Sequence, residues 1–155
     1  MTQSQLIDAW EIHNRISIYL LDAVDQGHLA DLSASKGRTV GEQFAHIHNV
    51  RLMWLKSAAP ELLDRVQKIE KENAGDKERL KESLMESGRL MSELLKRAEA
   101  AGGKVKGFKP HSGAFLGYMI SHESHHRGQI TLSLKQAGHP IDKKTQFGLW
   151  EWGVR

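Results

Sequence analysis

The 155-residue sequence contains no cysteine, only three prolines and no long apolar run. The missing cysteine excludes disulfides, thiolate–metal sites and a cysteine nucleophile, so a thiol can take part in any chemistry only as a bound ligand. No apolar stretch approaches the ~20 residues that a membrane span requires. The first residues also lack the basic segment and apolar core of a signal peptide. We therefore expect a cytoplasmic protein without a membrane partner.

The residues that are present have the composition of a globular protein. Hydrophobic residues make up 39% of the chain and charged residues 26%, which is typical of a chain that folds around a core. This length suits one domain over residues 1–155. The net charge of +3 arises from charges that alternate in sign, as along residues 68–82. Such alternation is typical of a solvated helix face, so we expect no nucleic-acid partner.

Four long segments repeat their apolar residues with helical spacing. Thr39 and Glu42 form a capping-box signature, Gly102 and Gly103 end one segment, and Gly138 with Pro140 ends another. A shorter helical piece is expected after Pro60, a residue suited to a first helical turn. The predicted long helices cover residues 4–25, 39–57, 76–101 and 113–137, and the short one covers residues 61–70.

No segment shows the strict alternation of a half-buried strand, and no hairpin dipeptide is present. Four amphipathic helices in one small domain predict an all-α fold, a four-helix bundle. The C-terminal tail carries Phe147, Trp150 and Trp152, which makes it too apolar for a free end. We expect it to pack on the bundle or on a partner.

The feature of the composition that needs an explanation is the presence of nine histidines. Residues four apart lie on one helix face, so His122 and His126 point the same way, in the sector expected to face the core. Two inward imidazoles are costly unless their nitrogens are satisfied. A divalent metal satisfies them, and an i, i+4 pair is a known metal clamp. The alternative is a pair of core histidines held by hydrogen bonds.

A metal needs a further ligand, and the helix over residues 39–57 offers two candidates. His46 and His48 are two residues apart and lie on opposite sides of the helix, and periodicity does not choose between them. His13 on the first helix is another candidate. The remaining histidines of loops and helix ends are expected to be exposed: His28, His111 and His139.

Two segments of the sequence resemble the DinB/YfiT-like metalloprotein superfamily. The segments are EQFAHIHNVRLMWL, residues 42–55, and SHESHHRGQITLSLKQAGHP, residues 121–140. Members of this superfamily are four-helix bundles, often dimeric, with one histidine from the second helix and an HxxxH pair from the fourth around a single divalent metal. The resemblance implies that the ligands are His46, His122 and His126, because the family histidine stands eight residues before a tryptophan, as His46 stands before Trp54.

The resemblance also implies a class of chemistry. Three neutral imidazoles leave the metal's double charge uncompensated and a coordination position open for water or substrate. Characterised relatives include transferases and isomerases that use low-molecular-weight thiols. We therefore expect one divalent transition metal ion per chain, zinc or nickel foremost and iron or manganese as alternatives. The expected activity is that of a thiol S-transferase or a related hydrolase or isomerase with a small-molecule substrate and a thiol cosubstrate.

Two further residues on the histidine face are catalytic candidates. Tyr118 lies one turn before His122, where its hydroxyl can orient substrate or donate a proton; the alternative is an ordinary core aromatic. Gln129 lies one turn after His126, where it can bond to a ligand or to a histidine, or tie the helix to a neighbouring backbone.

Several charged residues near the histidines have simpler expected roles. Glu42 belongs to the capping box, Glu123 is expected in an interface or a salt bridge, and Arg127 is expected to be solvated. The loop lysines ahead of the last long helix can attract an anionic thiol, although a plain solvated loop is the simpler interpretation: Lys104, Lys106 and Lys109.

A second class of function stays open. The chain can be a non-catalytic bundle that acts through protein contacts and carries a structural or incidental metal. Apolar surface from Trp150 and Trp152 would then support a homodimer.

Overall fold

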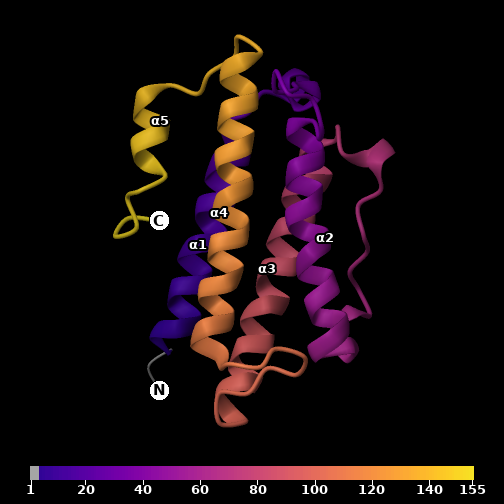
Figure 1. Ribbon diagram of the computed structural model, residues 1–155, viewed down its shortest axis with the longest axis vertical. Coiled ribbons are helices and arrows are strands. Elements are labelled where there is room, and N and C mark those ends of the chain that lie inside the picture. Colours follow the sequence, from indigo (N-terminus) through magenta and orange to yellow (C-terminus); the bar gives the residue numbers. More distant parts are fainter. Residues whose placement is uncertain (1–3) are drawn as a thin grey trace.

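The computed structural model describes residues 4–155 of the chain. Four long helices lie side by side in a bundle (Figure 1): α1 (Gln5–Asp22), α2 (Val40–Ala58), α3 (Lys77–Ala100) and α4 (Ser112–Gln136). A short helix, α5 (Lys143–Gly148), follows α4, and three 3-10 segments occupy connections, η1 (Gln26–Ala30), η2 (Pro60–Leu63) and η3 (Lys71–Asn73). The residues described contain no strand, only an isolated bridge between Val105 and Phe108. The predicted all-α four-helix bundle is confirmed.

Polar side chains fix where the long helices begin, because each accepts a hydrogen bond from an otherwise free N–H of the first turn. Ser4 accepts from the Leu6 amide, and Thr39 accepts from the Glu42 amide at 3.1 Å, as the capping signature predicted. Asp76 and His111 cap α3 and α4 in the same way. All four long helices therefore begin within one residue of the expected position. The α1 helix ends three residues earlier than expected, at Asp22.

The helical piece expected over residues 61–70 is the element that the sequence predicted wrongly. Only Pro60–Leu63 is helical, and residues 66–70 have no regular structure. Side chains of α2 bind the backbone there instead. The Asn49 amide donates to the Ile69 carbonyl and accepts from the Ile69 N–H, at 3.0 and 2.9 Å, and His48 Nε2 donates to the Gln67 carbonyl at 2.8 Å. These bonds replace the intrahelical ones and bury Ile69 against the bundle.

The interior consists of two apolar regions with a polar layer between them. One region contains Leu20, Phe44, Leu84 and Ile130, and the other contains residues nearer the opposite ends of the same helices: Trp10, Leu55, Met91, Phe115 and Met119. On every long helix the polar layer lies between these two apolar stretches. Buried polar groups need partners in such surroundings, and the layer supplies them from all four helices.

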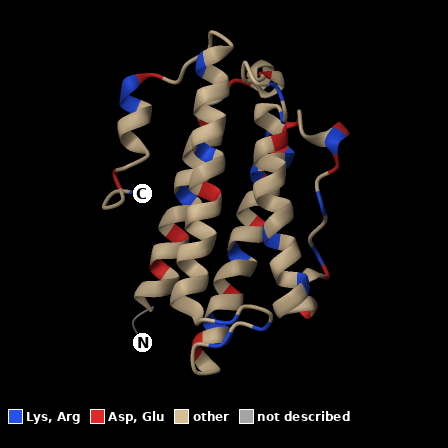
Figure 2. Cartoon of the chain, viewed as in Figure 1, with Lys and Arg blue, Asp and Glu red and all other residues tan. Residues whose placement is uncertain are grey.

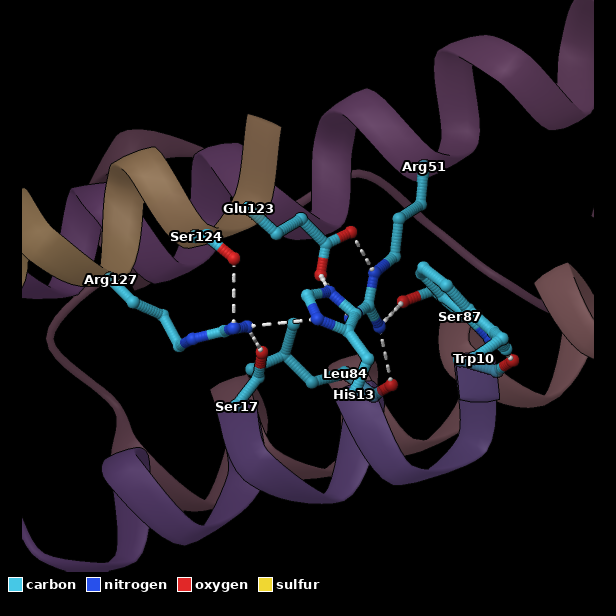
Figure 3. A network of polar contacts seen from close by, with 10 residues as sticks. Trp10, His13, Ser17, Arg51, Leu84, Ser87, Glu123, Ser124 and Arg127 are labelled. Carbon is cyan, nitrogen blue, oxygen red and sulfur yellow. Dashed lines mark hydrogen bonds and ion pairs between the residues drawn. The ribbon is translucent and has the colours of Figure 1, made fainter. Parts of the chain in front are cut away.

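An ion pair between Arg51 of α2 and Glu123 of α4 forms the centre of the polar layer (Figure 3). Both side chains are fully buried. The guanidinium binds the carboxylate through two bonds, Nη2 to Oε1 at 2.6 Å and Nε to Oε2 at 2.8 Å. Its Nη1 donates to the Leu84 carbonyl and to Ser87 Oγ of α3, at 3.0 and 3.2 Å, and the group also lies 4.9 Å from the ring centre of Trp10.

The polar network extends to α1 through the same carboxylate, that of Glu123. His13 Nε2 donates to Glu123 Oε1 at 3.0 Å, and its Nδ1 accepts from Arg127 Nη1 at 3.2 Å. Burial lowers the pKa of His13 despite the neighbouring carboxylate, in keeping with a neutral ring that donates at one nitrogen and accepts at the other. Burial alone would raise the pKa of Glu123, but its bonds to Arg51 and His13 hold that pKa below its usual range. Glu123 thus forms the salt bridge that was one of its two expected roles.

Arg127 does not have the solvated side chain that we expected. Its guanidinium turns back toward α1, where it donates to Ser17 Oγ at 2.9 Å and to His13. It also donates to Ser124 Oγ of its own helix at 3.0 Å. The helical wheel places its Cα away from the core, but a long side chain reaches acceptors that a wheel does not show. Burial lowers the pKa of Arg127 to about 10, so the group stays charged at neutral pH.

The C-terminal segment packs on α1 in part and leaves several large apolar side chains exposed. Gly148 lies against Tyr19 so closely that a Cβ would meet the phenol group, and the Arg155 guanidinium lies 3.8 Å from the centre of the Tyr19 ring. Phe147 and Trp150 nevertheless remain 71% and 82% exposed.

Acidic and basic residues are interspersed along the helices in view (Figure 2). Within the described part of the chain, no helix has the length and apolar character needed to cross a membrane.

Replacing Arg51 by Met is expected to destabilise the bundle strongly, because Glu123 would keep a buried charge without its main partner. We expect a loss of about 3–5 kcal/mol in the free energy of unfolding, measured by urea denaturation with circular dichroism. Combining Arg51→Met with Glu123→Leu removes both charges and is expected to recover part of this loss. A single variant as stable as the parent chain would contradict this account of the ion pair.

Candidate metal centre

Three histidines from two helices come together between α2 and α4. They are His46 of α2 and His122 and His126 of α4, and one ligand atom from each lies within 4.8 Å of the others. The Nε2 atoms of His122 and His126 are 3.2 Å apart. The ring centre of His46 lies 4.5 Å from that of His126 and 5.4 Å from that of His122. The structure thus brings together the three residues that the family resemblance selected.

The buried ion pair explains why α4 turns this face toward α2. At ~100° per residue, His122 and His126 lie about 100° and about 60° from Glu123, on the same side of the helical wheel. Glu123 is held in the bundle interior by Arg51 and His13. With that position fixed, the two histidines project toward α2, where His46 is half-buried.

Two glutamines determine which nitrogen of His126 is free. The amide oxygens of Gln43 and Gln129 lie 2.7 and 2.9 Å from His126 Nδ1, so Nδ1–H donates and Nε2 keeps its lone pair. Gln129 was expected to bond either to a ligand or histidine or to a neighbouring backbone, and the structure shows the bond to a histidine. Gln43 is a residue whose role sequence reasoning missed. Its signal is its position, three residues before His46 and on the same side of α2.

The donor set fits a divalent transition metal. The Nε2 atoms of His122 and His126 are 3.2 Å apart. If both bound one ion at about 2.1 Å, the N–metal–N angle would be about 100°, which suits tetrahedral or octahedral coordination. His122 also has a buried Nδ1 without a partner in the described part of the chain. If Nδ1 carries the proton, then two lone pairs face each other at Nε2, an arrangement that a bound cation would relieve.

All three rings are suited to bind a cation at neutral pH because they resist protonation. Burial lowers the pKa of His46 to about 4, with help from the charge of Arg38 and from His122. Burial lowers the pKa of His126 to about 4 as well, with further contributions from His122 and His46. The pKa of His122 is lowered by burial too. Imidazoles must be unprotonated to ligate a metal, so little binding energy is lost to proton release.

Two cavities adjoin the histidines, and Arg38 lines both. One, of about 270 Å³, contains His46 together with Lys68 and Lys71. The other, of about 320 Å³, contains residues of α4 and of the loop before α2: His126, Gln129, Lys36 and Arg38. Glu42 and Glu70 also line the first cavity. Arg38 lies immediately before the Thr39 cap of α2, and no motif at this position indicated a site.

The two alternative candidates, His48 and His13, lie elsewhere, and so does the neighbouring His125. His48 is buried on the side of α2 that residues 66–70 cover, where it binds Gln67, and His13 belongs to the ion-pair network. His125 is exposed, with its ring 5.0 Å from that of His126. Neither His13, His48 nor His125 belongs to the three-histidine group.

Tyr118 joins an aromatic cluster beyond the histidines. Its ring centre lies 5.6 Å from those of Trp54 and Phe108, and the residue is 42% exposed. It is therefore neither a fully buried core aromatic nor part of either cavity wall.

The loop between α3 and α4 lies at the end of the bundle where α4 begins (Figure 1), and its lysines are exposed. The basic groups that line the cavities are Arg38, Lys36, Lys68 and Lys71 instead. Lys104, Lys106 and Lys109 thus agree with the simpler interpretation of a solvated loop, and the alternative role of attracting an anion to the site finds no support in this placement.

Comparisons with known proteins agree with the geometry. The family model described as the DinB family matches residues 1–147. No curated protein and no solved structure matches the chain.

Alanine at His46, His122 or His126 is expected to abolish stoichiometric metal binding, because each substitution removes one of three donors. The measurement is elemental analysis of protein purified without chelator or nickel resin. His125→Ala, which removes an exposed neighbour outside the group, is the matched control and should retain the metal. If His48→Ala removes the metal while His46→Ala retains it, then the ligand set is wrong.

Proposed function

This chain belongs to the DinB family, and from that premise we propose that it is a metalloenzyme acting on a low-molecular-weight thiol. In this proposal His46, His122 and His126 hold one divalent transition metal ion, zinc or nickel foremost, and the reaction is an S-transfer or a related hydrolysis or isomerisation. The observation that carries the proposal is the three-imidazole group bordered by two cavities. A structural zinc site would instead be closed by four protein ligands.

A divalent ion in such a site supplies Lewis acidity, which lowers the pKa of bound water or thiol toward neutrality. The chain's own residues set up this chemistry. Gln43 and Gln129 keep the proton on His126 Nδ1 and orient the ring, a role that outer hydrogen-bond partners of metal ligands commonly have. Because no carboxylate belongs to the three-histidine group, the ligands cancel none of the ion's charge.

The charge around the cavities favours an anionic cosubstrate. Arg38 lines both cavities, and its charge helps to lower the pKa of His46 and His122. A guanidinium in that position can bind a carboxylate of a thiol in a bidentate manner. The sulfur nucleophile must come from this cosubstrate, since the sequence contains no cysteine.

The test is a metal-dependent thiol reaction. The zinc-loaded chain is given bacillithiol, mycothiol or glutathione with 1-chloro-2,4-dinitrobenzene, so that an S–C bond forms, the C–Cl bond breaks and the thiol proton passes to solvent. We expect a rate that His122→Ala abolishes. Arg38→Gln should raise the KM for the thiol about tenfold, the factor that ~1.4 kcal/mol represents, while metal content is unchanged. Arg38→Lys keeps the charge and is the matched control.

Equal rates for the metal-free and zinc-loaded chain would contradict the proposed enzyme. An unchanged KM in Arg38→Gln would contradict the role of Arg38 alone.

A second candidate function is supported by the exposed apolar residues of the C-terminal segment. We propose that Phe147 and Trp150, exposed at 71% and 82%, form part of a homodimer interface. Large exposed apolar patches commonly mark such surfaces. A non-catalytic interaction protein with a structural or incidental metal would use the same surface.

Trp150→Ser is expected to shift a dimer toward monomer in sedimentation velocity experiments, because it removes a large apolar side chain from the proposed interface. Met85→Ser on α3 removes another exposed apolar residue, 53% exposed, and should leave the assembly unchanged. A monomeric parent chain over the micromolar range would exclude the homodimer.

A further inference from the structure

A second group of metal-binding side chains lies at the end of the bundle where α4 ends and the α1–α2 connection begins. It consists of His28 of η1, Asp31 just after η1, and His139 just after α4, with one ligand atom from each within 4.8 Å of the others. His139 Nδ1 lies 2.7 Å from Asp31 Oδ2. The His28 and His139 rings are stacked, with centres 3.7 Å apart and planes inclined by 5°.

These side chains differ in exposure. The side chain of Asp31 is 11% exposed and that of His139 is 40% exposed, while that of His28 is 32% exposed. The expectation of a solvent-exposed residue therefore holds for His139 and not for the half-buried His28.

The backbone holds the three residues in place. Gly138 adopts a φ of +87°, and the His139 N–H then donates to the Leu134 carbonyl at 2.8 Å. This Schellman-type ending of α4 turns His139 toward the α1–α2 connection. On the other side, the Asp31 N–H donates to the His28 carbonyl, and the Asp31 carbonyl accepts from Val40. The donors are thus positioned by backbone bonds and not by flexible side chains alone.

The donor set is chemically suited to a transition metal ion. Two imidazoles and one carboxylate are a common ligand combination for zinc and for divalent iron. Donors bound to one ion at about 2.1 Å lie at most ~4.2 Å apart, a limit that His139 Nδ1 and Asp31 Oδ2 meet at 2.7 Å. The lone pairs of the two stacked rings are parallel, so one ring must rotate out of the stack for both imidazoles to bind the same ion. A cavity of about 120 Å³ lined by His28, His139 and Pro140 leaves room for water to complete the coordination.

We propose that His28, Asp31 and His139 form a second divalent-metal site, separate from the three-histidine group. The ion replaces the proton between His139 Nδ1 and Asp31 and links two segments that are 108 residues apart. Asp31 begins the loop that carries Lys36 and Arg38, and the loop is also tied to α4 by the Ala34 N–H, which donates to Gln136 Oε1 at 2.6 Å. A metal ion here would stabilise the loop that lines one wall of the larger cavity beside His126.

The test removes the three-histidine site first. His122→Ala/His126→Ala protein, freed of metal, is dialysed against Zn²⁺ and its bound zinc is measured by elemental analysis. We expect one zinc ion per chain and a rise in Tm on adding zinc, since a ligand that binds only the folded state stabilises it. Adding His139→Phe, which keeps a ring to stack on His28 but removes both nitrogens, should abolish the bound zinc and the rise in Tm.

His125→Phe in the same background is the matched control and should retain both signals. His28→Phe provides a second variant if circular dichroism shows that His139→Phe is unfolded. A His122→Ala/His126→Ala protein that binds no zinc would overturn the proposal, and so would equal zinc binding with and without the nitrogens of His139 or His28. Neither result depends on catalysis at the three-histidine group.

Discussion

The pairing of a buried charge is the constraint on which the rest of this structure depends. Glu123 is fully buried, and an unpaired carboxylate there would cost several kcal/mol. It is satisfied by Arg51 from α2 and His13 from α1, while Arg51 reaches two oxygens of α3. One carboxylate on α4 therefore fixes the rotation and depth of four helices. A purely apolar layer would tolerate a rotation of α4 about its own axis, whereas this network of directional bonds does not.

The same constraint shapes the metal centre. Glu123 stands next to His122 in the sequence, where a carboxylate ligand would be easy to supply, yet Arg51 and His13 occupy both of its oxygens. The three-histidine group is left with neutral donors only. The network also contains two guanidinium groups, since Arg51 binds the carboxylate and Arg127 binds the other nitrogen of His13. Arg38 adds a third on the open side. An anion is the ligand that such surroundings favour.

Much of the fold could be predicted from local signals, because helix caps and apolar periodicity act over a few residues. Thr39, Asp76 and the HxxxH spacing all have the expected places. The failures involve interactions between distant segments. Residues 66–70 read as helix, but Asn49 and His48 of α2 bind their backbone. Arg127 points outward on a helical wheel, yet Ser17 and His13 lie within its reach. Neither partner is visible from the neighbouring sequence.

The choice between His46 and His48 shows the same limit within the site. Both lie on α2 and each faces a different covered side, so no periodicity separates them. The two histidines differ in the groups that their side chains contact. His48 faces the backbone carbonyl of Gln67, an acceptor that needs a donor. His46 faces the imidazoles of His122 and His126, with which it forms a group that could hold a metal ion. The same holds for His28 and His139, which lie together at one end of the bundle. There Asp31 supplies a negatively charged partner. The histidines thus differ in role with the groups that each one meets. His111 caps α4, His13 and His48 form hydrogen bonds in the interior, and His46, His122 and His126 form a group that could hold a metal ion.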